Sequence, residues 1–304
     1  GTVLDMTGLN GVRLYEPGSL TLVAAAGTGL AEITSLLDRE NQRLAFEPMD
    51  HRGLLGSTGE STIGGVVAAN ISGPRRIQVG ACRDFLLGVR FVDGAGQIIK
   101  NGGRVMKNVT GYDLVKLMAG SFGTLGVLSE VALKVLPKSE TQAILRLQGL
   151  DDTRAIAALS AALGSPFDVS GAAHLPGRHS LIRLEGFTDS VAYRAAQLEA
   201  LLARFGPVDI INDATESAEM WRGIRDVSAF QHAKGDVWRI SVKPSDGPSV
   251  GLRVAAIAGQ VVYDWGGGLV WALVAEGRDL RAHLTGLQGH ARIERASDAT
   301  RKWL

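Results

Sequence analysis

Cysteine is almost absent from this sequence, which has Cys82 as its one copy in 304 residues. A single cysteine excludes an internal disulfide, and it excludes the clustered thiolates of an iron–sulfur or structural zinc site. It is typical of a reducing compartment. An excess of charge of one sign is missing too, because 32 Lys and Arg residues stand against 31 Asp and Glu residues. This balance argues against nucleic acid or anionic lipid as a partner.

Long hydrophobic runs and histidine clusters are also missing. One of the longest apolar runs, residues 269–275, is far short of the roughly 20 residues that a membrane helix needs. The six histidines are dispersed, so we expect no metal site and interpret them as surface or hydrogen-bonded residues. Arg183, Arg239 and Lys243 offer cations for a carboxylate, although solvated or ion-paired side chains are the favoured interpretation.

Glycine is abundant instead, with 39 copies, and it gathers in three stretches of the first half: residues 61–76, 80–84 and 107–127. Gly64 and Gly65 open a short helix of small residues, where free backbone N–H groups would meet a phosphate. The small residues that follow would let a flat ring lie against the backbone. The G-x-x-G-x-x-G spacing of residues 120–126 is not a Rossmann loop, because a helix precedes it and a strand follows it.

The hydrophobic pattern predicts an α+β protein. After Pro137 glycine becomes less frequent, and alanine-rich helices alternate with short strands. In the first half we expect helices at 31–37, 66–70 and 112–118, strands at 20–26, 44–46, 86–92, 97–100 and 127–136, and a long loop at 50–61. In the second half we expect strands at 143–147, 168–174, 181–185, 208–211, 237–242, 261–264, 269–274 and 291–293, and helices at 153–163, 191–205, 217–228, 250–258 and 280–287.

The second half repeats the order β-α-β-β-α-β, which is typical of ferredoxin-like folds, on either side of the linking helix at 217–228. Two such halves predict one larger antiparallel sheet with helices on one side. We therefore expect a first domain at residues 1–138 and a second, capping domain at residues 139–304.

Motifs spread along the chain carry a resemblance to a known family. They are Glu47-Pro48, Gly64-Gly65, Ser72–Arg76, Arg83-Asp84, Val105–Val109, Gly111–Asp113 and Gly123–Val127 in the first half, and Trp238–Val242 and Asp264–Gly267 in the second. The first half resembles the PCMH-type FAD-binding domain of the vanillyl-alcohol-oxidase family. In detail, nearly the whole chain is similar to the FAD-binding E subunits of bacterial glycolate oxidases.

The resemblance implies FAD contacts in four segments, while it implies no catalytic residue. The implied contacts are Pro48, Ser61, Thr62, Gly64, Gly65, Ala69, Asn70, Ile71, Ser72, Gly73, Gly123, Thr124, Leu125, Gly126 and Val127. For Arg83, Asp84 and Asp113 a structural ion pair or helix cap is favoured over direct cofactor contact, and Tyr112 is expected to pack.

Two departures from the family pattern bear on the cofactor. The glycine-rich pyrophosphate loop of the family does not occur in this sequence, so we expect that an upstream part of the FAD-binding domain is missing. Many relatives attach the flavin to a histidine beside the position of Ser72 and Gly73. No histidine lies there, so we expect noncovalent FAD.

Three functions remain open at this stage. The first is an accessory, electron-transferring FAD subunit of a complex that oxidises a small 2-hydroxy acid, beside a catalytic flavin subunit and an iron–sulfur subunit. The second is a self-sufficient FAD-dependent 2-hydroxy-acid dehydrogenase, and the third is a cofactor-free interaction scaffold. The missing histidine cluster favours the first over the second, and the glycine stretches favour both over the third. The resemblance also implies a cytoplasmic location, with the inner face of the membrane reached through the complex.

Overall fold

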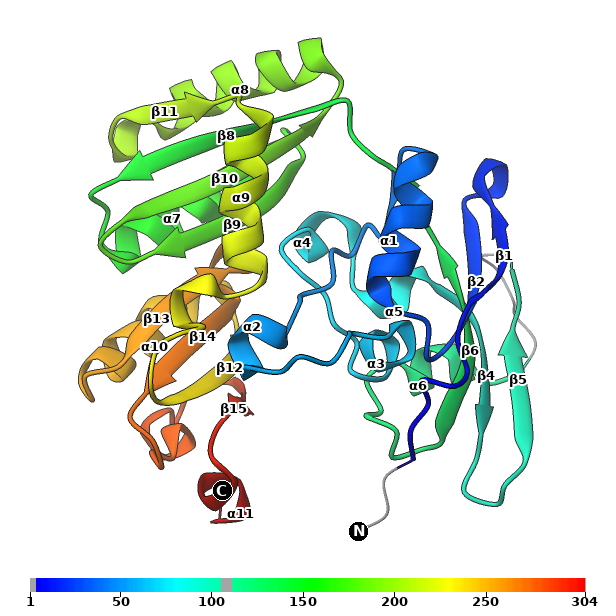
Figure 1. Ribbon diagram of the computed structural model, residues 1–304. Coiled ribbons are helices and arrows are strands. Elements are labelled where there is room, and N and C mark those ends of the chain that lie inside the picture. The colour runs from blue at the N-terminus through cyan, green and yellow to red at the C-terminus, as the bar shows by residue number, and fades with distance from the viewer. Residues whose placement is uncertain (1–3, 105–110, 304) are drawn as a thin grey trace. The chain divides into compact units, whose positions relative to one another are not determined.

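The computed structural model describes residues 4–104 and 111–303 (Figure 1). The chain forms two compact units. The first contains the residues up to Arg52 together with Thr58–Lys138, and the second contains Gly53–Ser57 and the residues from Ser139 onward. A short piece of the first half of the sequence is therefore part of the second unit.

The first unit is built on a five-stranded antiparallel sheet of order β1-β2-β6-β4-β5. Its strands are β1 (Val12–Glu16), β2 (Thr21–Ala25), β4 (Leu86–Val92), β5 (Ile98–Gly102) and β6 (Val127–Lys134), and β3 (Gln42–Arg43) pairs separately with β7 (Leu136–Pro137). Its helices are α1 (Leu30–Arg39), α3 (Ile63–Ala68), α4 (Arg76–Val79), α5 (Cys82–Phe85) and α6 (Leu114–Met118), and α2 (Arg52–Leu55) spans the division between the units.

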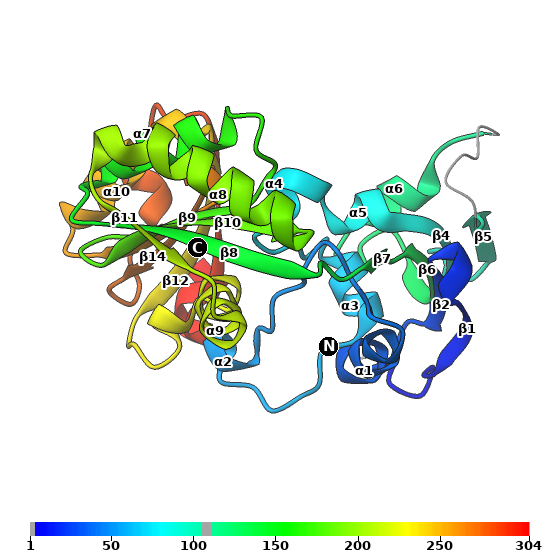
Figure 2. The same ribbon diagram turned by 90° about the horizontal axis from the view of Figure 1, so that it is seen from above.

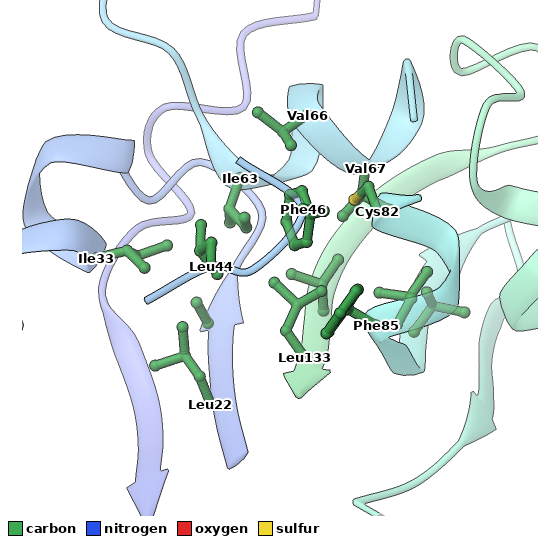
Figure 3. Packing of buried hydrophobic residues seen from close by; sticks show 14 of the residues in the cluster. Leu22, Ile33, Leu44, Phe46, Ile63, Val66, Val67, Cys82, Phe85 and Leu133 are labelled. Carbon is green, nitrogen blue, oxygen red and sulfur yellow. The ribbon is translucent and has the colours of Figure 1, made fainter. Parts of the chain in front are cut away.

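The core of the first unit lies between this sheet and the short helices, as Figure 3 shows. Phe46 and Phe85 meet there with their ring centroids 5.8 Å apart. Ile63 of α3 is fully buried, so it holds the glycine-rich segment against the core. Cys82 is also fully buried, and burial raises the pKa of its thiol. The protonated thiol is therefore a packing group and not a nucleophile.

Short elements account for the differences from the predicted pattern in the first unit. The strand expected at 44–46 is wrong, because these residues form a turn whose side chains Leu44 and Phe46 enter the core. Glu47 then takes a left-handed conformation (φ 54°), which ends the extended chain. When most residues of a short segment are apolar, the sequence shows no alternation, so its pattern cannot distinguish a buried turn from a buried strand. The expected loop at 50–61 also contains the single turn α2.

The second unit is built on an eight-stranded antiparallel sheet of order β11-β8-β10-β9-β13-β14-β12-β15. The strands are β8 (Thr141–Gln148), β9 (Val169–Leu175), β10 (His179–Gly186), β11 (Val208–Ile211), β12 (Asp236–Val242), β13 (Gln260–Asp264), β14 (Leu269–Val274) and β15 (Gly289–Arg295). In each half the first strand lies between the third and the fourth, as a ferredoxin-like βαββαβ unit requires. The predicted α+β fold with two halves in one antiparallel sheet is confirmed, although the second half has a 3-10 turn in place of its second helix.

Helices cover both faces of this sheet, and not one as expected. Figure 2 shows α7 (Asp152–Leu163) and α8 (Thr188–Leu202) on one face and α9 (Ala214–Arg225) on the other. The buried Trp221 fixes α9, because it fills the space beside Gly171 and lies 4.4 Å under the Arg183 guanidinium. In the second half α10 (Gly247–Ala255) is a helix as expected.

The last predicted helix, at 280–287, is wrong. The chain forms one 3-10 turn there, η6 (Leu280–His283), and Gly286 then takes a positive φ of 81° before β15 begins. Glycine in that conformation ends a helix, so the segment is too short for further turns. A terminal helix, α11 (Asp298–Trp303), was not expected from the pattern.

A buried polar network lies where the two halves of the sheet meet. Strands β9 and β13 pair at His174 and Tyr263, whose rings stack with centroids 5.7 Å apart. The Tyr263 hydroxyl donates to Asp152 Oδ2 at 2.5 Å, and His174 Nε2 lies 3.3 Å from Asp152 Oδ1. His174 Nδ1 lies 2.9 Å from the Ser180 hydroxyl. The network therefore connects α7 with strands of both halves.

This network makes the stability of the second unit dependent on pH at the acid end. Burial by itself raises the pKa of Asp152, but hydrogen bonds from His174 and Tyr263 outweigh it and hold that pKa below its usual value. A lowered folded-state pKa contributes stability that is present above the unfolded pKa of about 3.9 and is lost as the pH falls through the folded value. We expect the melting temperature to fall more steeply below about pH 4 in the wild type than in Asp152→Asn. Equal slopes in thermal scans from pH 3 to 6 would contradict this.

Candidate functional site

Helix α3 is the centre of the glycine-rich segments, and its first turn is already hydrogen-bonded within the protein. The N–H of Ile63 donates to Thr28 O at 2.9 Å, and the N–H of Gly64 donates to Ala26 O at 2.8 Å. The N–H of Gly65 points to its own N-cap, the Thr62 hydroxyl, at 3.3 Å. The expectation that these N–H groups are free for a phosphate is therefore wrong. The helix begins against the end of β2, which supplies acceptors that the local sequence does not contain.

The two adjacent glycines have different roles. A Cβ on Gly64 would lie 2.7 Å from both Cβ and O of Ala26, so Gly64 is needed for close packing on β2. A Cβ on Gly65 would meet only Thr62 Oγ1, at 3.3 Å. Gly65 is exposed while Gly64 is buried. The backbone of Gly65 is thus open to a ligand, and the packing of the fold does not require a glycine there.

The turn at residues 120–126 lies against the last residues of α3. The N–H of Gly120 donates to Val67 O at 3.1 Å, and that of Phe122 donates to Ala68 O at 2.9 Å. Phe122 has a left-handed backbone (φ 54°) and a side chain that is 56% exposed. Ser121 Oγ is buried and has no hydrogen-bond partner among the residues that the structure describes. Strained backbone and an unsatisfied buried hydroxyl are features that functional sites often combine.

The side chains of Asn70 and Ser72 hold the second glycine-rich stretch. Asn70 Oδ1 accepts from the N–H of Arg83 at 2.9 Å, and the Ser72 hydroxyl accepts from the N–H of Cys82 at 2.9 Å. These acceptors are therefore engaged in the fold, so the backbone of residues 69–73 is what they leave for a cofactor. The Asp84 carboxylate accepts from the N–H of Ala81 at 2.8 Å, which confirms its expected role as a cap.

Pro48 joins the site through its neighbours. An ion pair of 3.2 Å connects Arg75 Nη1 with Glu47 Oε1, and the N–H of Gly73 donates to Phe46 O at 2.9 Å. The Glu47-Pro48 motif and the motif that begins at Ser72 are therefore parts of one structure. Pro48 itself is half-buried beside them.

Two further sequence expectations concern the third stretch. Asp113 is confirmed as a helix cap, because it accepts from the N–H of Lys116 at 3.0 Å. Tyr112 does not pack as expected, since its side chain is 89% exposed. The motif Val105–Val109 lies outside the described residues. Ser121 was not among the residues that the motifs predicted, and its one signal in the sequence is a polar residue inside a glycine turn.

The structure thus places the predicted residues 61–65 and 69–73 at the two ends of one short helix. Residues 123–126 continue the turn whose Gly120 and Phe122 bond the end of that helix, and Val127 opens β6. Two observations fit a flat cofactor such as FAD at this place. The open backbone at Gly65 allows close approach, and the unsatisfied Ser121 hydroxyl offers a hydrogen bond. We therefore take this cluster, centred on α3, as the candidate cofactor site.

Two of the candidate carboxylate-binding cations of the second unit are engaged in packing. Arg183 is buried, and it contacts the Ser170 hydroxyl at 3.1 Å and Glu185 Oε2 at 3.5 Å. Arg239 lies over the ring of Trp265, 5.2 Å from its centroid. Lys243 is exposed. The favoured interpretation of Arg183 as an ion-paired residue is confirmed.

The face of the second unit's sheet that α9 covers contains a cavity of about 200 Å³. Leu175, Arg178, His179, Leu181, Glu219, Met220, Gly223, Ile224, Val227, Ser228, Ala229 and Val262 line it. Burial and nearby cations lower the pKa of His179, so this imidazole is neutral at pH 7. Within residues 4–104 and 111–303 no group of three or more His, Cys, Asp or Glu side chains is arranged to hold a metal ion. In the same ranges no helix has the length and apolar character to span a bilayer.

Comparison with known proteins gives a family for the first unit and a relative for almost the whole chain. Residues 1–102 match the family model described as FAD binding domain. The glycolate oxidase subunit GlcE of Escherichia coli (strain K12) is 35% identical over 300 residues, which are 98% of this chain and 78% of that protein.

Larger relatives match over about half of the chain. The D-lactate dehydrogenase of Anaerostipes hadrus is 33% identical over 156 residues, and the glycolate oxidase subunit GlcD of Bacillus subtilis (strain 168) is 34% identical over 145 residues. These matches span 31% and 29% of the relatives' lengths. Among solved structures, alkyldihydroxyacetonephosphate synthase has a TM-score of 0.69 at 15% identity, over 94% of this chain and 63% of that one. That likeness shows a shared fold.

Proposed function

Because the chain belongs to the family of the glycolate oxidase subunit GlcE, we propose that it is an FAD-binding subunit of a complex that oxidises glycolate or another small 2-hydroxy acid. One observation carries the cofactor part of this proposal. Three glycine-rich segments meet around α3, where the backbone of Gly65 is exposed and where the buried Ser121 hydroxyl has no hydrogen-bond partner among the residues that the structure describes.

FAD, when bound, supplies a ring that accepts electrons and passes them on within the complex. The protein's part is to bind and orient this ring. The backbone around Gly65 would lie against the cofactor, and the Ser121 hydroxyl would donate a hydrogen bond to it. The side chains of Thr62, Asn70 and Ser72 act indirectly, because their hydrogen bonds hold the backbone segments of the site in place. The other residues named from the family pattern remain proposed contacts.

The proposed FAD is noncovalent, since the segment of residues 69–73 contains no histidine to carry a flavin bond. We expect heat or acid to release free FAD into the supernatant. The measurement is the visible spectrum of supernatant and pellet after precipitation. A flavin that stays with the precipitated polypeptide would contradict the proposal that FAD is bound noncovalently.

We further propose that the chain acts beside a catalytic flavin subunit and an iron–sulfur subunit, and does not oxidise substrate by itself. Oxidation of a 2-hydroxy acid needs a carboxylate clamp and a base for the hydroxyl proton. Arg183 and Arg239, two candidates for the clamp, are already engaged by Glu185 and Trp265. Cys82, the one cysteine, is buried and cannot form an iron–sulfur centre to receive electrons.

The test is anaerobic mixing of the FAD-loaded chain with glycolate, and separately with D-lactate. We expect the flavin absorption band to persist over minutes when the chain is alone. We expect it to bleach when partner subunits are present with substrate. Rapid bleaching by the isolated chain would make it a self-sufficient dehydrogenase. A chain that never takes up FAD would leave the scaffold as the better explanation.

A further inference from the structure

The cavity of about 200 Å³ beside α9 is lined by residues of the second unit alone. Its walls are mainly apolar side chains from the sheet, from α9 and from the turn after α9: Leu175, Leu181, Met220, Ile224, Val227 and Val262. Protein interiors are close-packed and rarely leave a void larger than one water molecule. This space equals the liquid volume of about seven water molecules, so it needs an explanation.

Gly223 is one reason why the cavity exists. It lies in the last turn of α9 and lines the cavity, and a Cβ there would meet nothing within 4 Å. Glycine is unfavourable in a helix, because it loses more backbone entropy on folding than any other residue. The packing leaves room for a side chain at this position. The helix therefore keeps an unfavourable residue where a longer side chain would fill the cavity.

Val227 lines the cavity with a strained backbone. It follows the end of α9 in a left-handed conformation (φ 50°, ψ 45°), and the residue is only 1% exposed. A β-branched residue rarely adopts this conformation, which glycine adopts without strain. Strained residues of this kind gather at ligand-binding and active sites. Backbone strain and a helical glycine are therefore independent observations that point to the same cavity.

Two basic side chains from the turn between β9 and β10 give the cavity a polar side. Arg178 is exposed, and no acceptor in the part of the chain that the structure describes binds its guanidinium. His179 is half-buried, and burial together with nearby positive charges lowers the pKa of its imidazole. The imidazole is therefore neutral at pH 7 and offers one N–H donor. Glu219 also lines the cavity, but it is exposed, so water and salt screen its charge.

We propose that this cavity binds a small monocarboxylate with an apolar chain of about four to six carbons. The carboxylate would pair with the Arg178 guanidinium, whose parallel N–H donors match its two oxygens, and would accept from His179. The chain would lie against the apolar walls. No residue of the candidate cofactor site lines this cavity, so the proposed ligand is a second one besides FAD.

The test is isothermal titration calorimetry of the full chain with sodium 4-methylpentanoate, which fits the cavity by size and has no hydroxyl group to oxidise. We expect a dissociation constant of about 0.1 mM for the wild type. Glycolate has the same carboxylate without the apolar chain, so it should bind at least about tenfold more weakly. Equal affinities for glycolate and 4-methylpentanoate would overturn the proposed ligand class.

Gly223→Leu separates ligand binding from stability. The leucine side chain would fill the cavity, so we expect the affinity for 4-methylpentanoate to fall at least about a hundredfold. The melting temperature should stay at or above that of wild type, because leucine favours a helix more than glycine does. If Gly223→Leu does not fold, Gly223→Ala serves instead, with an expected loss of about tenfold. Wild-type affinity in a folded Gly223→Leu protein would overturn the proposal, since the ligand would then bind elsewhere.

Arg178→Gln tests the carboxylate contact, with Arg222→Gln as its matched control. Arg222 is an exposed residue of α9 that does not line the cavity, so both variants remove one positive charge from the same region. We expect about tenfold weaker binding in Arg178→Gln and wild-type binding in Arg222→Gln.

Two results with these proteins would overturn the proposal. One is the absence of binding to the wild type at ligand concentrations up to about 10 mM. The other is an equal loss in Arg178→Gln and Arg222→Gln, which would reflect net charge and not a contact with Arg178. No readout involves flavin, so these results do not depend on whether the chain takes up FAD.

Discussion

Gly65→Val is expected to weaken FAD binding by about a hundredfold, or about 2.7 kcal/mol, while the protein stays folded. The reason is the open backbone at this position. A Cβ there meets only Thr62 Oγ1, at 3.3 Å, so the branched side chain extends into the space where the cofactor would approach. The measurement is the dissociation constant for FAD, with the far-ultraviolet spectrum and the melting temperature as checks of the fold.

Two other glycines provide the controls. Gly223→Val changes a helical glycine of α9, where an added Cβ would meet nothing within 4 Å, and it should leave FAD affinity unchanged. Gly64→Ala places a Cβ 2.7 Å from Ala26 and should destabilise the first unit by about 1–3 kcal/mol, as overpacking does. Full FAD affinity in a folded Gly65→Val protein would mean that the cofactor does not approach α3 at this residue.

Gly251→Ala is expected to destabilise the second unit by about 3–5 kcal/mol, which combines overpacking with the loss of a hydrogen bond to a charged group. Gly251 lies in α10 directly above the buried network. A Cβ there would be 1.8 Å from the Tyr263 hydroxyl oxygen and 2.7 Å from Asp152 Oδ2. The tyrosine must therefore move, and its bond to Asp152 must break. Urea denaturation would measure the change in the free energy of unfolding.

A double variant makes this prediction specific to the hydroxyl. Tyr263→Phe removes the oxygen that clashes, at a cost of about 1.5–3 kcal/mol for the bond to Asp152. The pair Gly251→Ala and Tyr263→Phe should then be more stable than Gly251→Ala alone, because the added methyl group gains room. Additive losses would show that the clash involves other atoms. A loss below about 0.5 kcal/mol for Gly251→Ala would contradict the close approach itself.

The order of strands and helices in the second unit followed from local pattern. The helix α7 and the strand β14, for example, begin and end within two residues of their predicted positions. Period and length are properties of neighbouring residues, so a single sequence contains them. The strand expected at 44–46 and the helix expected at 280–287 were wrong because left-handed residues, Glu47 and Gly286, decide where those segments turn.

The composition by itself excluded disulfides and a cluster of thiolates, and the glycine-rich motifs indicated the segments of the candidate cofactor site. Gly64 and Gly65 differ in role because only Gly64 packs against Ala26. Asn70 and Ser72 are structural acceptors because the fold places the N–H groups of the second glycine-rich stretch beside them. The hold of Arg295 on Leu54 joins residues 241 positions apart. Packing and hydrogen bonding act over only a few ångströms, so such contacts form where the tertiary fold brings distant segments of the chain together. The periodicity of neighbouring residues in the sequence contains no information about these contacts.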